Sequence, residues 1–532
     1  MCIRDSFHWS VTTSARQQTQ ETMTSANRTA GQRNDYVLSI DAGTTGIRCR
    51  AVYPDGRSGP VAYREFTQYF PEPGWVEHDA REIWSAVRST FADVVAAAGL
   101  PAAIGITNQR ETVVAWDRRT GEPAAPAIVW QDRRTADTCE ALQRAGNLDT
   151  VRRITGLVLD PYFSGTKMSW LLQRMDASGS ARPTSLALGT IDSWILWNLT
   201  GGDVFATDPS NASRTMLFDL RSMTWSDVMA DLLGIPIDAL ATVMPSSGTF
   251  GVTNTPDLPS GIPITGIAGD QQSALFGQAC FRPGMAKNTY GTGSFILMNI
   301  GSVCPDPVEG LLTTVAWSLG TPAGKPKVTY ALEASIFVTG AAVQWLRDGL
   351  GIISASSDIE ALARTVDDNG GVICVPAFTG LGSPWWDPHA RGAILGITRG
   401  TTKAHLARAV VESMALQTRD ALEAMQRASG QAMDDLRVDG GASVMDLLLQ
   451  IQADQLGITV RRPRDQETTS LGAAFLAGLA CGLWPDQEAI AASWSEEAVF
   501  RPHPMDSAER VAAEALHTLW LRGVERSRHW TK

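Results

Sequence analysis

Short apolar stretches that lead into glycine- and threonine-rich turns recur along the chain. The first, residues 36–40, runs into the turn 41–46 and is followed by a second apolar stretch at 47–53. Apolar strand, Gly/Thr turn and apolar strand together are typical of a β-hairpin. Residues 285–299 repeat this pattern around the turn 290–294. The pattern therefore predicts one hairpin in each half of the chain.

Between and after the hairpins, strand and helix periods alternate. Residues 80–98 carry apolar side chains at helical spacing, and buried strands are predicted at 102–107 and 262–268. The second of these strands leads into a helix that starts at Asp270. A further strand runs into glycines at 440–441 and then into a long helix from about 443 to 456. Strands alternating with helices favour a layered α/β fold.

The length of 532 residues predicts two to four domains. Because the second hairpin follows Cys280, we expect an N-terminal domain over 35–280, a C-terminal domain over 281–532, and a small-molecule cleft between them. Residues 1–34 are rich in Ser, Thr, Gln and Arg and are expected to form a disordered extension. A transit peptide is the alternative interpretation of this segment.

Charge and composition exclude several functional classes. A net charge of −11 argues against a general nucleic-acid binder, which needs a basic face. The seven cysteines form no CxxC pair, which favours reduced cytoplasmic thiols over a disulfide framework or a zinc site. No apolar run reaches the ~18 residues that span a bilayer. We therefore expect a cytoplasmic protein without a membrane span.

The turn 41–46 has the chemistry of a phosphate site. Its glycines permit a tight backbone whose N–H groups form an anion-binding concavity, and the carboxylate of Asp41 suits Mg²⁺. An ordinary hairpin turn is the alternative. The turn 290–294 offers a second cradle, and 440–441 offers flat backbone for an adenine. Because the chain has no GxxxxGK[ST] motif, it is not a P-loop protein.

Asp270 is the candidate general base. Phosphoryl transfer to a hydroxyl requires a group that accepts the hydroxyl proton, and an Asp commonly does so. A helix N-terminus would keep this carboxylate ionised, although a plain N-cap is the alternative role. Arg110 and Glu111 follow the strand 102–107, and we expect both charges to emerge at the cleft edge. There they could donate to and accept from adjacent hydroxyls of one polyol.

Three aromatic residues, Trp130, Tyr162 and Phe295, are candidates for packing against the carbon skeleton of that polyol. Core packing is the alternative for each of them.

Many separate segments resemble the FGGY carbohydrate kinases, in the same order and at the same spacing over roughly residues 35–525. They are 41–45, 74–79, 108–112, 130–135, 162–167, 211–215, 266–278, 288–295, 386–388, 392–412 and 438–442.

This resemblance implies two actin-like, ribonuclease H-like domains that close on ATP and a polyol. It implies transfer of the γ-phosphoryl group of ATP to glycerol, giving sn-glycerol 3-phosphate, with Mg²⁺ bound alongside ATP and a dimeric or tetrameric homo-oligomer. Another acceptor, such as xylulose, ribulose or erythritol, is the first alternative. A non-catalytic actin-like nucleotide-binding protein is the second.

Matched residue by residue, the resemblance implies that Asp270 is the base, while the metal role of Asp41 rests on the chemistry of its turn. The positions implied to contact the polyol are Arg110, Glu111, Trp130, Tyr162, Asp270, Gln271 and Phe295. The positions implied to contact the nucleotide are Thr44, Thr45, Gly46, Arg48, Thr292, Gly293, Gly340, Gln344, Gly441 and Met445.

The chain departs from the family pattern at three places. Ala42 and Gly46 replace a Gln and a Ser that are usual in the first turn, and Met445 replaces an Asn near the adenine. The loop 254–261 contains no Arg. Because a bisphosphate needs cationic partners, we expect no feedback by fructose 1,6-bisphosphate through this loop.

Overall fold

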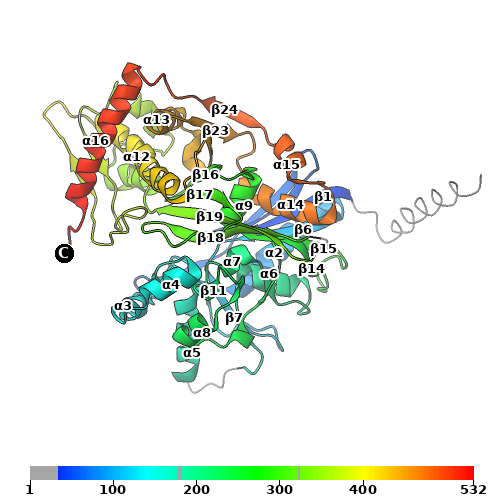
Figure 1. Ribbon diagram of the computed structural model, residues 1–532. Helices are drawn as coiled ribbons and strands as arrows, with labels where there is room; N and C mark the ends of the chain where they lie inside the picture. Colours follow the sequence, from blue (N-terminus) through cyan, green and yellow to red (C-terminus); the bar gives the residue numbers. More distant parts are fainter. Residues whose placement is uncertain (1–33, 178–182, 322–323, 532) are drawn as a thin grey trace, which may run out of the picture.

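The computed structural model describes residues 34–177, 183–321 and 324–531. Their strands form one large sheet, one five-stranded sheet and three two-stranded sheets, with helices packed on both sides of the large sheet (Figure 1). The expected extension 1–34 lies outside these residues except for Asn34, which already belongs to the first strand, β1 (Asn34–Ala42).

The large sheet has thirteen strands within the described residues and runs through both halves of the molecule. Its order is β24 (Glu496–Phe500), β23 (Thr459–Pro463), β22 (Asp435–Asp439), β16 (Ala286–Tyr290), β17 (Ser294–Gly301), β19 (Lys327–Ile336), β18 (Leu312–Leu319), β14 (Ser247–Val252), β15 (Pro263–Gly269), β6 (Pro101–Asn108), β1, β2 (Gly46–Val52) and β3 (Ser58–Glu65).

The two halves of this sheet meet at a narrow seam. Among the described residues, β14 and β18 pair only at Ser247 and Leu319, with Gly320 N donating to Ser247 O at 2.9 Å. By contrast, β1 and β6 pair along nearly their whole length. The sheet is therefore continuous in topology while its halves share very few backbone hydrogen bonds.

Both expected hairpins are present. β1 and β2 flank the first turn, and β16 and β17 flank the second. β1 forms because its apolar positions are buried on both faces, as in a central strand. A five-stranded sheet in the N-terminal half comprises β4 (Gln68–Tyr69), β5 (Glu77–His78), β8 (Ala127–Ile128), β7 (Val113–Asp117) and β9 (Leu186–Thr190).

The helix expected at 80–98 is α2 (Ala80–Ala98), which has those same bounds. The Asp79 side chain caps it by accepting from Arg81 N, and Ile83, Val87 and Phe91 face the core. Other helices of the N-terminal half are α3 (Ala136–Arg144), α4 (Leu148–Thr155), α5 (Ser164–Ala177), α6 (Ile191–Leu199), α7 (Pro209–Ala212), α8 (Asp227–Leu233) and α9 (Asp270–Gly277).

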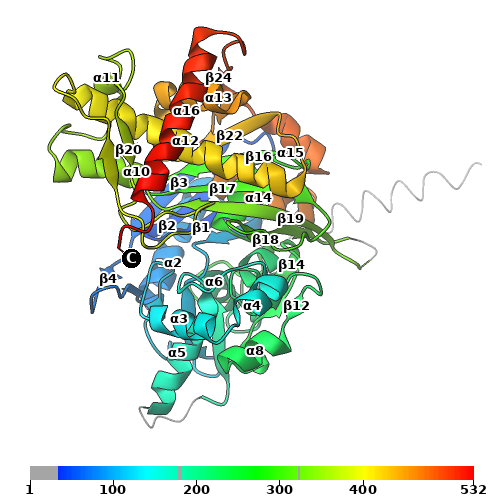
Figure 2. The ribbon, with the colours of Figure 1, turned by 60° about the vertical axis from the view of Figure 1, so that its left-hand side comes forward.

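The C-terminal half is covered on its outer side by α12 (Lys403–Ser429) and α16 (Ala508–Ser527), which lie side by side in Figure 2. Trp520 and His517 of α16 both hydrogen-bond Asp420 of α12, at 2.7 and 2.8 Å. This half also contains α10 (Gly340–Gln344), α11 (Asp358–Ala363), α13 (Asp446–Leu456) and α15 (Gln487–Ser493), together with the strands β20 (Ile373–Val375) and β21 (Ala393–Leu395).

One helix late in the chain returns to the first half. α14 (Thr468–Cys481) packs on α9 and on β1, β6 and β15, and Figure 1 shows it beside α9 and β1. Its Leu471 and Phe475 share a buried core with Val37 and Ala268 of the N-terminal half. The N-terminal sheet is thus completed by residues near the end of the chain.

Candidate active site

Asp270 stands at the junction of β15 and α9. Gly269 is the N-cap and Asp270 the first helical residue, so the alternative of a plain N-cap is wrong. The Asp270 carboxylate accepts from the backbone N–H of Gln271 at 2.7 Å and lies 3.1 Å from Arg110 Nε. A Cβ on Gly269 would lie 2.6 Å from Arg110 Cγ, so only glycine lets the arginine approach this closely.

Arg110 and Glu111 are brought to the same place, but they are buried there. Both side chains are only 2 % exposed, so the expectation that they emerge at a cleft edge is wrong. Gln109 N donates to Ala42 O at 2.7 Å and ties their loop to the end of β1. Glu111 has a φ of 63°, a left-handed backbone that non-glycine residues seldom adopt outside functional sites.

The N–H groups of Arg110 are almost fully matched by acceptors. Its terminal nitrogens donate to both oxygens of Glu333 at 2.5 and 3.1 Å, to the Tyr162 hydroxyl at 3.1 Å and to Gln272 Oε1 at 3.2 Å. Together with the ion pair to Asp270, these contacts fix the guanidinium plane.

Two residues of this cluster, Glu333 and Arg214, were missed by sequence reasoning. Arg214 donates to Glu111 at 2.7 Å and to Glu333 at 3.0 Å. Arg214 lies in the segment 211–215, so the family resemblance offered a signal for it. Glu333 lies inside the otherwise buried strand β19, where no local pattern marks it as functional.

The three candidate aromatic residues form a half-buried cluster beside these charges. The ring centroid of Trp130 lies 5.7 Å from that of Tyr162 and 6.4 Å from that of Phe295, both edge to face. Trp130 Nε1 also donates to Thr44 Oγ1 at 3.1 Å. The candidate polyol wall therefore adjoins the first phosphate turn.

A buried lysine, Lys287, lies behind Gln271. Its ammonium group donates to Gln271 Oε1, to Thr289 Oγ1 at 2.8 Å and to Phe295 O at 3.3 Å. Burial lowers the pKa of Lys287 to about 8. Sequence reasoning missed this residue, although it immediately precedes the matched segment 288–295.

The pKa values of Asp270 and Asp41 are both raised by burial, but different neighbouring charges act on each. Burial raises the pKa of Asp270 above the usual range, while Arg110, the Gln271 N–H and Lys287 act to lower it. For Asp41, burial together with nearby Asp270 and Glu467 raises the pKa to about 7, against the lowering effect of Arg48. A cation would relieve the repulsion around Asp41.

The candidate nucleotide residues of the C-terminal half gather around the second turn. Gly340 N donates to Gly291 O at 3.1 Å, and a Cβ on Gly440 would lie 2.4 Å from Tyr290 O. Gln344 is exposed. Met445 is 7 % exposed and packs in the hydrophobic core, so it offers no polar group to a base.

The candidate phosphate-binding residues of the first turn differ in their exposure and contacts. Thr45 is exposed and Gly46 is buried. A Cβ on Gly46 would lie 2.6 Å from Arg64 O, so the glycine permits tight packing of the hairpin. Arg48 is ion-paired with Glu467, which precedes α14.

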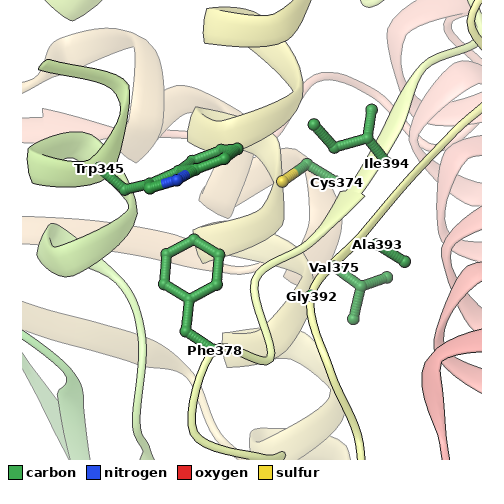
Figure 3. Close-up of a pocket in the computed structure, with 7 residues that line it drawn as sticks. All are labelled: Trp345, Cys374, Val375, Phe378, Gly392, Ala393 and Ile394. Carbon is green, nitrogen blue, oxygen red and sulfur yellow. The ribbon is translucent and has the colours of Figure 1, made fainter. Parts of the chain in front are cut away.

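An apolar pocket of about 400 Å³ lies next to the nucleotide residues, because Trp345 in its wall directly follows Gln344. Figure 3 shows the rings of Trp345 and Phe378 close together with the sulfur of Cys374 turned toward them. The two ring centroids are 5.2 Å apart. None of the residues that line this pocket belongs to the charged cluster.

Two properties bear on metal and membrane binding. Within the described residues, no group of three or more His, Cys, Asp or Glu side chains is arranged to hold a metal ion. No helix in the described part of the chain is long and apolar enough to cross a bilayer.

Two family models match the chain. The N-terminal domain of the FGGY family of carbohydrate kinases matches residues 36–277, and the C-terminal domain matches 286–481. A glycerol kinase from Trichlorobacter lovleyi is 54 % identical over 93 % of this chain and 99 % of that protein. Glycerol kinase 2 from Thermotoga maritima is 52 % identical, with the same coverage of both chains.

Solved structures agree. Plasmodium falciparum glycerol kinase with ADP superimposes with a TM-score of 0.85 at 33 % identity, covering 92 % of this chain and 98 % of that one. A xylulose kinase from Lactobacillus acidophilus gives 0.83 with the same coverage but 22 % identity, a likeness of fold alone. The predicted two-domain, actin-like α/β fold is confirmed. The chain belongs to the FGGY family of carbohydrate kinases.

Proposed function

We propose that this chain is an ATP-dependent glycerol kinase, which transfers the γ-phosphoryl group of ATP to glycerol to give sn-glycerol 3-phosphate and ADP. The observation that supports this proposal most is the position of Asp270 at the start of α9, with its carboxylate 3.1 Å from Arg110 Nε. The relatives that are 54 % and 52 % identical over nearly their full length are named glycerol kinases, which bears out the expected activity.

Asp270 acts as the general base in this proposal. The hydroxyl that attacks phosphorus must lose a proton, and an ionised carboxylate at a helix N-terminus is suited to accept it. Arg110 and Lys287 oppose the effect of burial on its pKa and so favour the ionised carboxylate that the proposal needs. Removing the carboxylate charge should therefore slow transfer more than ATP binding.

The acceptor is held by charge on one side and by aromatic rings on the other. Arg110 donates to, and Glu111 accepts from, neighbouring hydroxyls, while Gln271 lies beside the base. The apolar edge of the glycerol carbons packs on the cluster of Trp130, Tyr162 and Phe295. This arrangement suits a short polyol better than a long sugar.

The nucleotide lies against the second turn and the glycines around it, with Thr44, Thr45, Gly46 and Arg48 at the phosphates. Thr292, Gly293, Gly340, Gln344 and Gly441 are the corresponding C-terminal contacts, and the family resemblance supports them. We assign residues 35–280 to the polyol and phosphate part and 281–532 to the nucleotide part. The two family models, which end at 277 and begin at 286, support a boundary between these positions.

The residues around Asp41 fit a magnesium ion. Asp41 is the second-last residue of β1, and two further acids, Asp270 and Glu467, act on its carboxylate. Mg²⁺ is usually held by one or two carboxylates together with phosphate oxygens, so a site with few protein ligands is expected. When bound with ATP, the ion screens phosphate charge. Family resemblance also supports a dimeric or tetrameric assembly and a cytoplasmic location.

Release of ADP in a coupled assay tests the proposal. With ATP and Mg²⁺, we expect ADP release that depends on glycerol and is much weaker with xylulose, ribulose or erythritol. A preference for one of those acceptors would indicate another FGGY kinase. Slow ATP turnover that no polyol changes would indicate a non-catalytic nucleotide-binding protein.

Asp270→Asn should lower kcat about 10²- to 10⁴-fold, the usual contribution of a general base, while ATP binding is retained. Isothermal titration with ATP checks the binding. Near-full turnover of this variant would rule out Asp270 as the base.

A further inference from the structure

Four buried charged side chains form a closed ring behind the acceptor site. Arg110 and Glu111 are each 2 % exposed, and Arg214 and Glu333 are fully buried. Glu333 contacts both arginines, and Arg214 continues the ring to Glu111 at 2.7 Å. Two positive and two negative charges balance one another, which such a buried cluster requires.

Glu333 occupies the central position of this ring. Its Oε2 accepts from Arg110 Nη1 at 2.5 Å, and its Oε1 accepts from Arg110 Nη2 at 3.1 Å and from Arg214 Nη2 at 3.0 Å. Burial acts to raise the pKa of Glu333, but Arg110 and Arg214 outweigh this effect and hold it below its usual range. The carboxylate is therefore a fixed anion.

The backbone around Glu333 is rigid. It lies on β19, opposite Leu297 of β17 on one side and Leu312 of β18 on the other. A side chain on a strand that is paired along both edges is a precise anchor. This anchor belongs to the C-terminal half, whereas Arg110, Glu111 and Arg214 come from the N-terminal half.

The anchor decides which edge of Arg110 faces Asp270 and Tyr162. Because Glu333 binds both terminal nitrogens, Nε is turned toward Asp270 and the remaining Nη2 donor toward Tyr162. Arg214, held by the same carboxylate, fixes Glu111. The groups proposed to hold neighbouring hydroxyls thus take their positions from one residue.

We propose that Glu333 is a positioning residue for the phosphoryl acceptor, acting on Arg110 directly and on Glu111 through Arg214, without touching the acceptor itself. This assignment rests on the proposed function. It adds to the acceptor site a second residue of the C-terminal half, beside Phe295, to which the family resemblance gave no role.

Glu333→Gln tests the assignment. The amide keeps the volume, but its NH₂ group would face guanidinium donors, so Arg110 must turn. A displacement of this kind is expected to raise the KM for glycerol about 10- to 100-fold. The KM for ATP should stay within about twofold of wild type.

The pH profile gives a second readout. Asp270 faces Arg110 and Lys287, which lower its pKa, and Glu333 and Asp41, which are further negative charges. When Arg110 turns in Glu333→Gln, Asp270 loses the charge that lowers its pKa most, and this outweighs the loss of the weaker Glu333 charge, so the pKa of Asp270 rises. The acid limb of kcat/KM for glycerol should move to higher pH, an effect that a general loss of stability would not cause.

Glu412→Gln is the matched control. Glu412 is also a buried carboxylate, 4 % exposed, but it pairs with Arg408 at 2.7 Å and Asn369 at 2.6 Å and contacts none of the four charged residues of the ring. It should affect stability but neither the KM for glycerol nor the acid limb. An equal rise in KM for both variants would overturn the proposal.

The remaining outcomes are also decisive. If wild-type protein releases no ADP with glycerol, the proposed function itself fails. If wild type is active and Glu333→Gln has an unchanged KM for glycerol, only the positioning role fails. Should Glu333→Gln not fold, Arg214→Lys decides, because it keeps the charge but cannot bridge Glu333 and Glu111 with two nitrogens as the guanidinium does. A selective rise in KM supports the role, and an unchanged KM overturns it.

Discussion

Asp41 and Asp270 follow similar strands, yet their surroundings give them different chemistry. Asp270 lies against an arginine and a helix N-terminus, whereas Asp41 has two acids, Asp270 and Glu467, as well as Arg48 nearby. The sequence identifies both, because each ends an apolar strand. Two partners that shift the pKa of Asp270, Glu333 and Lys287, lie within buried strands and leave no local pattern. Only the fold shows that both strands bring these charges to Asp270.

If Asp270 is the general base, its ionisation should determine how kcat/KM for glycerol depends on pH. Because transfer needs ionised Asp270, kcat/KM for glycerol should fall as the pH falls through the pKa of this group, which burial raises above the ordinary range. Lys287→Met removes a charge that lowers this pKa. The acid limb should then move to higher pH by about one unit, the effect of one nearby charge.

Lys167→Met is the control for this shift. Lys167 is equally buried and its pKa is likewise lowered to about 8, but its ammonium group donates to the carbonyls of Pro161, Tyr162 and Phe163. This variant should leave the acid limb in place. Equal shifts in both variants would mean that Lys287 does not act through Asp270.

At the level of elements, periodicity predicts α2 to the residue and both hairpins nearly so. The helix expected from 443 begins instead at Asp446, because residues 441–444 form a 3₁₀ turn first. Periodicity does not show which helix or strand a given element packs against. The packing of α14 against α9 depends on small residues whose neighbours lie nearly 200 positions away, namely Gly277 and Gly472.

Gly472→Ala tests this contact. A Cβ at Gly472 would lie 1.8 Å from Ser273 O, a backbone atom of α9 that cannot move alone. We expect a loss of about 1–3 kcal/mol in the free energy of unfolding, as for overpacked cores. Because α9 carries Asp270, kcat should fall as well. Urea unfolding and the ADP assay measure the two effects.

Gly478→Ala separates stability from activity. On the same helix, its added Cβ would meet the ring of Trp484 instead of α9. It should destabilise the protein while kcat per folded molecule is preserved. If Gly472→Ala also kept its kcat, the α9–α14 contact would not position the base.

At the scale of the whole molecule, the seam between β14 and β18 permits a change of angle between the halves. Few backbone hydrogen bonds cross it, each worth about 1 kcal/mol net, so a rotation that keeps the ion pairs of Glu333 with Arg110 and Arg214 disrupts little strand pairing. The resemblance predicted closure around ATP and acceptor, and closure of this kind excludes water from the transfer. The narrowness of the seam could not be foreseen from the sequence, since β14 and β18 carry no distinguishing pattern.

Small-angle X-ray scattering measures this motion. The radius of gyration should decrease when glycerol and a non-hydrolysable ATP analogue are added together, and less with the analogue alone. The forward scattering gives the molecular mass, and hence the number of subunits, in the same experiment. An unchanged radius with both ligands present would contradict closure.

The return of α14 to the first half has a consequence for biosynthesis. The apolar face formed by β1, β15 and α9 is made early, but the helix that buries it ends at Cys481. At typical synthesis rates of about 5–20 residues per second, roughly 10–40 s separate the two events. During that interval the nascent first half exposes a surface that its own later sequence must cover. The solubility of the newly made N-terminal half therefore depends on α14, which is synthesised much later.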